Sequence, residues 1–342
     1  MQKTPLHFPK TVAHDLGPST QQLACSTLAS LIEEWLSDCL IKQHSPRTIE
    51  LRRILTRRLL WFLEEQNHAT CGRSELRAFF AYLTNGHQSA KGRWNKDDSG
   101  SAKRWTKPLR PTTIATYHRH FKAFFSWAIA EELLSESPMN RVPAPVVRVD
   151  QVQPFTTAQV QSLLAAAQKS RYPKRDEAIV LFLIDSGVRV SELCNLRMSD
   201  VDFLGGTARV HGKGNKYRTV CFGRRAARAL RAYLRYEDRS PDEPLFVAER
   251  GLDTGAKLTR WGVAQVIERL GKKAGIQRAR CSPHTFRHTF AGDFLRNGGN
   301  VFSLKELLGH CGLAMTNQYV ALAQADIQAQ HRQFSPGDRL KK

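Results

Sequence analysis

The sequence predicts a mainly helical protein of two domains, the second of which contains a small antiparallel β-sheet. Most segments repeat apolar residues at the spacing of one helical face. Two short runs of β-type residues, 207–211 and 217–222, are separated by Gly-Lys-Gly-Asn-Lys, a pattern typical of a hairpin. The proline-punctuated stretch VPAPVVRVDQVQPF at 142–155 favours extended backbone and therefore predicts a linker between the domains.

Four helices are expected in the first domain. The first covers about 26–40, where apolar residues follow one helical face. The second begins at the Ser-Pro pair 45–46, a capping residue followed by proline at the first helical position. The third spans about 74–83 and the fourth starts near Pro111. Between them, 84–110 is rich in Gly, Ser, Lys and Arg and is too polar for a core.

The second domain begins with a helix start, because Thr156 and Gln159 have the spacing of a capping box. A buried helix is expected at about 176–185, ending before Gly187. The hairpin follows and carries Lys213 near its tip. Further helices are expected at about 224–236, 259–274, 283–297, 303–309 and 315–325.

The chain is strongly basic. Its 342 residues include 52 Lys and Arg against 31 Asp and Glu, giving a formal net charge of +21. Residues 1–150 carry 21 basic and 14 acidic side chains, and residues 151–342 carry 31 and 17, so both halves are cationic. A polyanion that contacts both domains suits this distribution, and the sequence favours a nucleic acid. A soluble basic protein without such a partner remains the alternative.

Several classes of protein are excluded. The longest clear apolar run, 178–184, is much shorter than the roughly 18 residues of a membrane-spanning helix. The first 14 residues lack the apolar stretch of a secretory signal, which favours the cytoplasm. Seven cysteines without a CxxC pair or a regular spacing argue against a disulfide framework and against a zinc site. We therefore expect no membrane partner and no metal.

Two basic helical faces are candidate phosphate contacts, with a solvated surface as the alternative for each. The second helix of the first domain displays Arg52, Arg53 and Arg57. The segment 224–236 carries a stripe of four arginines on one face: Arg224, Arg228, Arg231 and Arg235.

The segment Ser282-Pro283-His284-Thr285-Phe286-Arg287-His288 starts a helix with a capping serine and a proline. His284 and Arg287, three residues apart, share one face near the positive end of that helix, which suits an anion. A helix start whose His and Arg merely face solvent is the first alternative. Metal binding by His284 and His288 is the second, and it is disfavoured because Thr285 stands where a zinc helix has glutamate.

Four further residues are ordinary when taken singly: Arg189 after the buried helix, Lys213 in the hairpin, His310 in Leu-Gly-His, and Tyr319 nine residues beyond it. Together with His284 and Arg287 they supply cationic or donor groups and one nucleophile. Those are the groups that metal-free cleavage of a phosphodiester requires.

Four strings in this chain resemble the signature segments of tyrosine recombinases of the phage-integrase and Xer type: DSGVRVSELCNLRMSDVD (185–202), HGKGNKYRTV (211–220), SPHTFRHTFA (282–291) and LLGHCGLAMTNQYV (307–320). They occur in the family's order and at its intervals. The resemblance implies a mostly α fold of the DNA breaking-rejoining type, with a four-helix, SAM-like core-binding domain before a mainly helical catalytic domain. The expected parts are an extension at 1–25, the core-binding domain at 26–141, the linker at 142–155, the catalytic domain at 156–325 and a tail at 326–342.

By this resemblance, Tyr319 corresponds to the nucleophile, and the other catalytic positions are Arg189, Lys213, His284, Arg287 and His310. Glu192 matches a supporting acidic position. The implied reaction forms a 3′-phosphotyrosyl link and exchanges strands between two DNA sites through a Holliday junction, without cofactor or metal. A homotetramer on double-stranded DNA with paired recognition sites is expected, in the bacterial cytoplasm or nucleoid, with accessory directionality factors as possible partners and a mobile genetic element as one setting.

Two other functions stay open on the sequence. A type IB topoisomerase shares tyrosine attack and an arginine-rich pocket, and it differs in relaxing DNA without paired sites. A catalytically silent DNA-binding regulator on the same scaffold is the other, although the six catalytic positions are all filled with the expected residue types.

Overall fold

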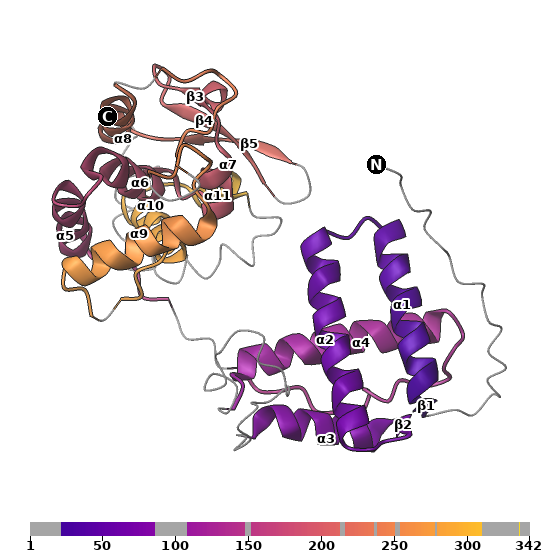
Figure 1. Ribbon diagram of the computed structural model, residues 1–342. Helices are drawn as coiled ribbons and strands as arrows, with labels where there is room; N and C mark the ends of the chain where they lie inside the picture. The colour runs from indigo at the N-terminus through magenta and orange to yellow at the C-terminus, as the bar shows by residue number, and fades with distance from the viewer. Residues whose placement is uncertain are drawn as a thin grey trace. The chain divides into compact units, whose positions relative to one another are not determined.

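The computed structural model describes residues 22–85, 108–147, 152–212, 216–235, 238–249, 254–277, 279–309 and 335. The chain divides into two compact units, residues 1–149 and 150–342, and the division falls within the stretch expected to be a linker (Figure 1). Several predictions fall outside the described residues: Lys213, His310, Tyr319, the helix at 315–325, the tail 326–342, most of the basic stretch 84–110 and the first 21 residues.

The described part of the first unit contains four helices: α1 (Cys25–Ile41), α2 (Pro46–Glu65), α3 (Arg73–Thr84) and α4 (Pro111–Ala130). Helices α1 and α2 lie side by side, and α4 crosses and contacts both (Figure 1). Two short strands, β1 (Leu23–Ala24) and β2 (Thr70–Cys71), pair antiparallel, and the sequence did not predict them.

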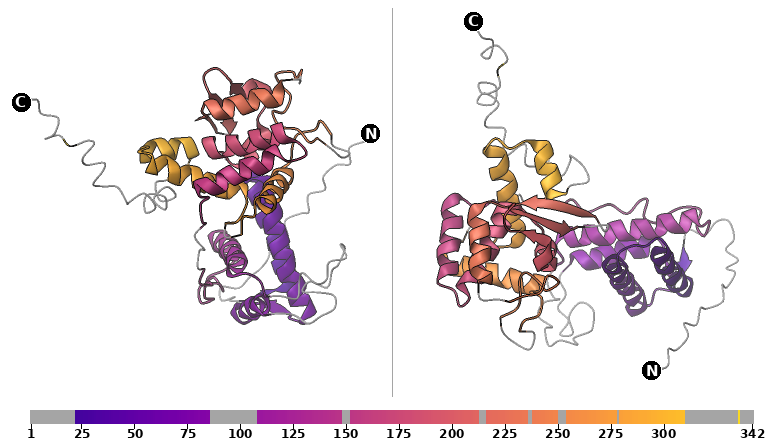
Figure 2. Two further views of the ribbon diagram at one scale, coloured as in Figure 1. Left: turned by 90° about the vertical axis from the view of Figure 1, so that its left-hand side faces the viewer. Right: turned by 90° about the horizontal axis from the view of Figure 1, so that it is seen from above.

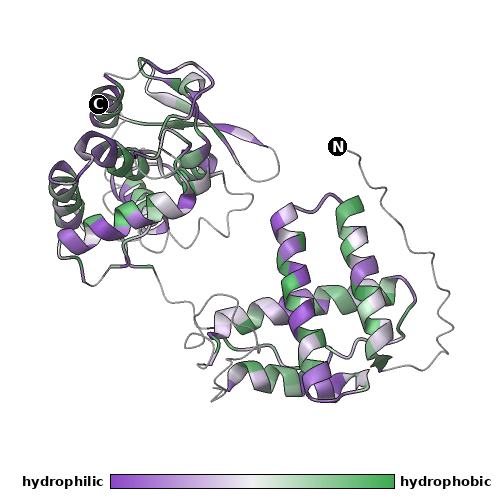
Figure 3. Ribbon diagram, viewed as in Figure 1, coloured by the Kyte–Doolittle hydropathy of each residue, from purple (hydrophilic) through white to green (hydrophobic). Residues whose placement is uncertain are grey.

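The core of the first unit is aromatic. Phe79, Tyr117, Phe121, Phe124 and Phe125 are all buried, and α3 meets α4 through ring pairs such as Phe79–Tyr117, whose centroids are 5.7 Å apart. Figure 3 shows hydrophobic and hydrophilic positions on each of these helices, as expected where one face packs inward.

The second unit contains seven α-helices among its described residues: α5 (Thr157–Gln168), α6 (Pro173–Ser186), α7 (Val190–Asn195), α8 (Arg224–Leu234), α9 (Arg260–Lys273), α10 (Pro283–Arg296) and α11 (Val301–Leu308). Its sheet has the antiparallel order β3 (Val201–Asp202), β4 (Thr207–His211) and β5 (Tyr217–Cys221). Ala208 pairs with Val220 between β4 and β5. Helices α10 and α11 lie together, and α11 contacts β5 (Figure 2).

Helix α6 is the centre of this unit. Its residues 178–183 are all buried, and it packs against α5, α8 and α10. It ends at Gly187, whose φ of 61° is left-handed, as the predicted helix stop requires. The predicted mostly helical fold with a small antiparallel sheet is therefore confirmed, whereas the six-residue α7 and the two-residue β3 were not expected. Within the described ranges, the helices are all too short or too polar to cross a membrane.

Candidate active site

The turn at Gly187 places Arg189 at the start of α7. Val188 is buried beside it, and the backbone N–H of Arg189 donates to Glu192 Oε2 at 2.8 Å. The Arg189 guanidinium donates through Nη1 to Glu192 Oε1 at 2.9 Å. One carboxylate therefore fixes both the backbone and the side chain of Arg189.

Glu192 is almost fully buried, with 1% of its surface exposed. Arg218 of β5 donates to both of its oxygens, through Nη1 at 2.6 Å and Nη2 at 2.8 Å. Burial by itself raises the pKa of the Glu192 carboxyl, but the hydrogen bonds from Arg218 and Arg189 together outweigh it, and the pKa lies below its ordinary value. Glu192 is therefore an anion held between two arginines.

Arg287 connects the ends of two helices. It lies on α10, which begins as predicted, with the Ser282 side chain accepting from Thr285 N and with proline at the first position. The Arg287 side chain is buried and donates through Nη1 to Gly187 O at 2.8 Å and through Nη2 to Leu308 O at 2.7 Å. The first bond ties it to the turn before Arg189, and the second to the end of α11.

Three guanidiniums thus converge on residues 307–309 at the end of α11. Arg218 Nε donates to Leu307 O at 2.9 Å, and Arg189 Nη2 donates to Gly309 O at 3.3 Å. Among the described residues, the cluster combines three guanidiniums with the single carboxylate of Glu192, so its positive charges outnumber its negative ones. The Arg189 side chain is 33% exposed, so an anion in solution can reach it.

His284 lies one helical turn before Arg287 on α10 and is paired with His288. Their Nε2 atoms are 2.9 Å apart and their rings are nearly perpendicular, at 88°. Burial, followed by the nearby charges of Arg287 and Arg280, lowers the pKa of His284. Burial, followed by His284 and Arg287, lowers the pKa of His288 to about 4. Both rings are therefore neutral near pH 7, and one donates to the other.

Of the residues predicted from the sequence, the structure brings Arg189, Glu192 and Arg287 together, with His284 close to Arg287. Arg218 was not predicted from the sequence. It shares a strand face with Val220, which is buried, and an arginine at such a position signals a buried partner.

The three arginines of α2 that were predicted as phosphate contacts differ from one another in their surroundings. Arg52 lies 4.5 Å over the Trp35 ring and donates to His44 Nδ1 at 2.9 Å, so its guanidinium packs within the unit. Arg53 lies 3.7 Å from Glu33, and Arg57 is exposed. The four stripe arginines, Arg224, Arg228, Arg231 and Arg235, are all exposed, and Arg231 also donates to Phe203 O.

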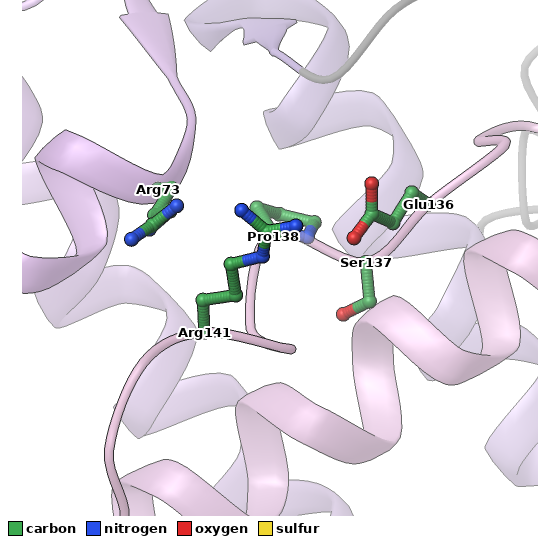
Figure 4. A pocket seen from close by; sticks show the side chains of 5 residues that line it. All are labelled: Arg73, Glu136, Ser137, Pro138 and Arg141. Carbon is green, nitrogen blue, oxygen red and sulfur yellow. The ribbon is translucent and has the colours of Figure 1, made fainter.

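Two pockets lie outside this cluster. One in the first unit, about 90 Å³, is lined by Arg73, Glu136, Ser137, Pro138 and Arg141, and in the view of Figure 4 the Arg141 guanidinium lies between Arg73 and Glu136. A second, about 540 Å³, lies beside β4 and β5, where Arg197 pairs with Asp242 and Arg209 lies 3.9 Å from Asp200. Neither pocket concentrates positive charge as the arginine cluster does.

The described part of the chain holds no group of three or more His, Cys, Asp or Glu side chains placed to bind a metal ion. His284 and His288 form a pair with each other.

Comparison with known proteins identifies relatives across most of the chain. A sequence profile of the phage integrase family matches residues 153–326. The tyrosine recombinase XerC of Leptospira interrogans serogroup Icterohaemorrhagiae serovar copenhageni (strain Fiocruz L1-130) is 31% identical over 272 residues, which cover 78% of this chain and 79% of that protein. The tyrosine recombinase XerC of Mycobacterium bovis (strain BCG / Pasteur 1173P2) is 32% identical over 294 residues, covering 78% and 94%.

Solved structures share the fold. The Tn1549 transposon integrase in complex with a circular intermediate DNA has a TM-score of 0.63 at 19% identity, covering 85% of this chain and 94% of that one. The XerH site-specific recombinase bound to palindromic difH substrate, in a post-cleavage complex, has a TM-score of 0.59 at 18% identity, covering 92% and 97%. The match to the family profile, the identity to the XerC proteins and the arginine cluster agree: this chain is a tyrosine-type site-specific recombinase and belongs to the phage integrase family.

Proposed function

We propose that this recombinase cleaves a DNA strand with the Tyr319 hydroxyl, forms a 3′-phosphotyrosyl link, and rejoins the strand to a second recognition site through a Holliday junction. The convergence of Arg189 and Arg287 on the end of α11, directly before His310 in the chain, carries the proposal. Tyr319 follows Gly309 by ten residues, and a chain of that length spans up to about 35 Å. That length is compatible with an attack by the phenol on a phosphate held by the arginines.

The arginines would hold the scissile phosphate. A guanidinium presents a planar fork of N–H groups that matches two phosphate oxygens. In this role, Arg189 and Arg287 stabilise the negative charge that develops on the non-bridging oxygens as the tyrosine attacks, and His310 adds a further donor. Removing one such donor typically lowers the rate ~10²–10³-fold.

Two proton transfers accompany the attack. A phenol has an ordinary pKa of about 10, so its proton must be accepted as the bond to phosphorus forms. His284 suits that role because its lowered pKa keeps the ring neutral near pH 7. Lys213 directly follows Gly212, which comes just after β4, and would protonate the departing 5′ oxygen from the predicted tip of the hairpin.

Double-stranded DNA with paired recognition sites is the proposed substrate. Both halves of the chain are basic, and the exposed stripe on α8 can neutralise phosphates. The integrase and XerH structures named above contain DNA, which supports the same partner here. We extend the proposal to a homotetramer on DNA in the bacterial cytoplasm, with accessory factors setting direction and a mobile genetic element as its setting.

Covalent trapping tests the reaction. The wild-type protein is incubated with a randomised duplex pool in EDTA, and DNA that stays bound in SDS is recovered and used as the probe. We expect Tyr319→Phe to lose the SDS-resistant complex and to keep its affinity for the same duplex in a band-shift assay. A variant that still traps DNA would contradict the assignment of Tyr319.

The same probe separates the alternative functions. A recombinase exchanges strands between two copies of the selected duplex. A topoisomerase would instead relax supercoiled plasmids that lack the selected sequence. A silent regulator would bind the pool without any SDS-resistant complex.

A further inference from the structure

The last carbonyls of α11 are each taken by an arginine from a different element. Leu307 O accepts from Arg218 of β5, Leu308 O from Arg287 of α10, and Gly309 O from Arg189 at the start of α7. Carbonyls at the end of a helix have no intrahelical partner and lie at the negative end of its dipole. The three guanidiniums therefore stabilise the end of α11 and are themselves oriented by it.

Arg218 differs from the other two because both of its terminal nitrogens donate to one buried carboxylate, that of Glu192. Its side chain is 14% exposed, against 33% for Arg189. All three guanidinium nitrogens are engaged, with Nη1 and Nη2 on Glu192 and Nε on Leu307 O. Glu192 in turn holds Arg189. Arg218 is thus the side chain that joins β5, α7 and α11.

Two glycines lie against Arg218, and Gly309 is the one that allows close packing. A Cβ added to Gly309, whose φ is 63°, would lie 3.0 Å from Arg218 Cδ. A Cβ added to Gly212 would lie 3.5 Å from Glu192 Oε1 and 3.6 Å from Arg218 Nη1. Gly212 precedes Lys213, and Gly309 precedes His310. Arg218 therefore lies beside two residues, Gly212 and Gly309, that directly precede proposed catalytic residues in the chain.

We infer that Arg218 is a positioning residue of the active centre: it fixes Glu192, and through it Arg189, against the end of α11 from which the His310–Tyr319 segment departs. This inference rests on the proposed function. Arg218 acts without contacting the phosphate, because its three guanidinium nitrogens already donate to Glu192 and to Leu307 O. A lysine cannot replace it, since one ammonium group cannot form both bonds to the Glu192 carboxylate together with the third bond to Leu307 O.

The first test needs no DNA. Selective ¹³C labelling of glutamate allows the Glu192 carboxyl of the full-length protein to be titrated by NMR, with Glu192→Gln to assign its signal. In the wild type we expect the pKa of Glu192 to lie below its ordinary value. In Arg218→Met we expect this pKa to be raised, because the hydrogen bonds from Arg218 that chiefly offset the effect of burial are then absent. An unchanged Glu192 titration in Arg218→Met would overturn the inference.

The second test separates positioning from folding. On the duplex selected by the wild-type protein, we expect Arg218→Met and Arg218→Lys to cleave ~10²-fold more slowly in single turnover with unchanged affinity. In Arg218→Met/Glu192→Gln the unpaired buried charge is gone, so the melting temperature should recover while cleavage stays slow. Cleavage that recovers together with the melting temperature would overturn the inference. Arg209→Met, on the neighbouring strand with a 67% exposed side chain, is the matched control.

A bridging sulfur at the 5′ position distinguishes the two routes by which Arg218 could act. A thiolate leaves without being protonated, so this substrate should restore cleavage to Lys213→Ala. It should not restore cleavage to Arg218→Met, whose defect lies in the Arg189 contact with the phosphate. Restored cleavage in Arg218→Met would show that Arg218 acts through the hairpin and would overturn the inference. Failure of the wild type to trap any DNA would instead count against the proposed function, while the Glu192 titration still tests the contacts of Arg218.

Discussion

The backbone of Gly187 lies directly against the ring of Phe290, so that a Cβ on this glycine would fall 2.3 Å from Phe290 Cδ1. The same glycine has a φ of 61°, and its carbonyl accepts a bond from Arg287. The turn that leads to Arg189 therefore requires glycine for two reasons, backbone conformation and close packing.

Replacing Gly187 with alanine should destabilise the protein by at least about 2 kcal/mol. The alanine would have to adopt a left-handed backbone conformation, and its Cβ would also clash with the ring of Phe290. Urea unfolding measures the loss. Gly275→Ala is the matched control, since Gly275 has a φ of 68° but nothing within 4 Å of its added Cβ. Equal losses in the two variants would show that the contact with Phe290 has no effect on stability.

The free energy of unfolding should decrease as the pH falls below the ordinary pKa of histidine. The pKa of His288 is about 4 in the folded protein and about 6.5 in an unfolded chain. Between these values the unfolded state binds a proton that the folded state does not, so the contribution of His288 to the free energy of unfolding decreases from about pH 6.5 down to about pH 4 and then levels off. His288→Gln should flatten this dependence in urea unfolding at several pH values. Parallel curves for the variant and the wild type would contradict the prediction.

Arg287→Lys should lower the free energy of unfolding more than Arg189→Lys does. Arg287 is 4% exposed and bonds two backbone carbonyls, so losing its fork leaves a buried carbonyl unsatisfied, at about 1–3 kcal/mol. Arg189 is more exposed than Arg287. When Arg189 is replaced, its partner Glu192 still forms its ion pair with Arg218. Urea unfolding compares the variants, with Arg296→Lys, on the exposed side of α10, as the control. An Arg189 variant that is the less stable of the two would contradict this ranking.

The arginine stripe on α8 should appear in the salt dependence of DNA binding. If Arg228 contacts a phosphate, Arg228→Gln should reduce the slope of log K against log salt by about 0.9. Binding titrations at several salt concentrations measure the slope. Arg47→Gln is the control, because Arg47 is exposed and already paired with Glu50 at 2.8 Å. The same slope in both variants and the wild type would exclude Arg228 from the interface.

Local signals in the sequence predicted most elements well. The Ser45, Thr156 and Ser282 side chains each cap the helix they were expected to start. The hairpin strands were predicted within one residue, because alternation and a glycine-rich turn are local properties. Helix α7 and the pair β1–β2 were missed, because such short elements depend on distant partners rather than on their own sequence. The catalytic roles assigned to Arg189, Lys213, His284, Arg287, His310 and Tyr319 stay predictions.

By itself, the sequence determined the order of the helices, the position of the hairpin, the cationic character and the family, because each is written in neighbouring residues or in motifs. Only the tertiary structure decided that Arg52 packs over Trp35 while Arg57, on the same helix, faces solvent. It alone revealed Arg218, whose partners Glu192 and Leu307 are 26 and 89 residues away. Such contacts depend on how helices and strands pack, and spacing along the chain carries no record of that packing.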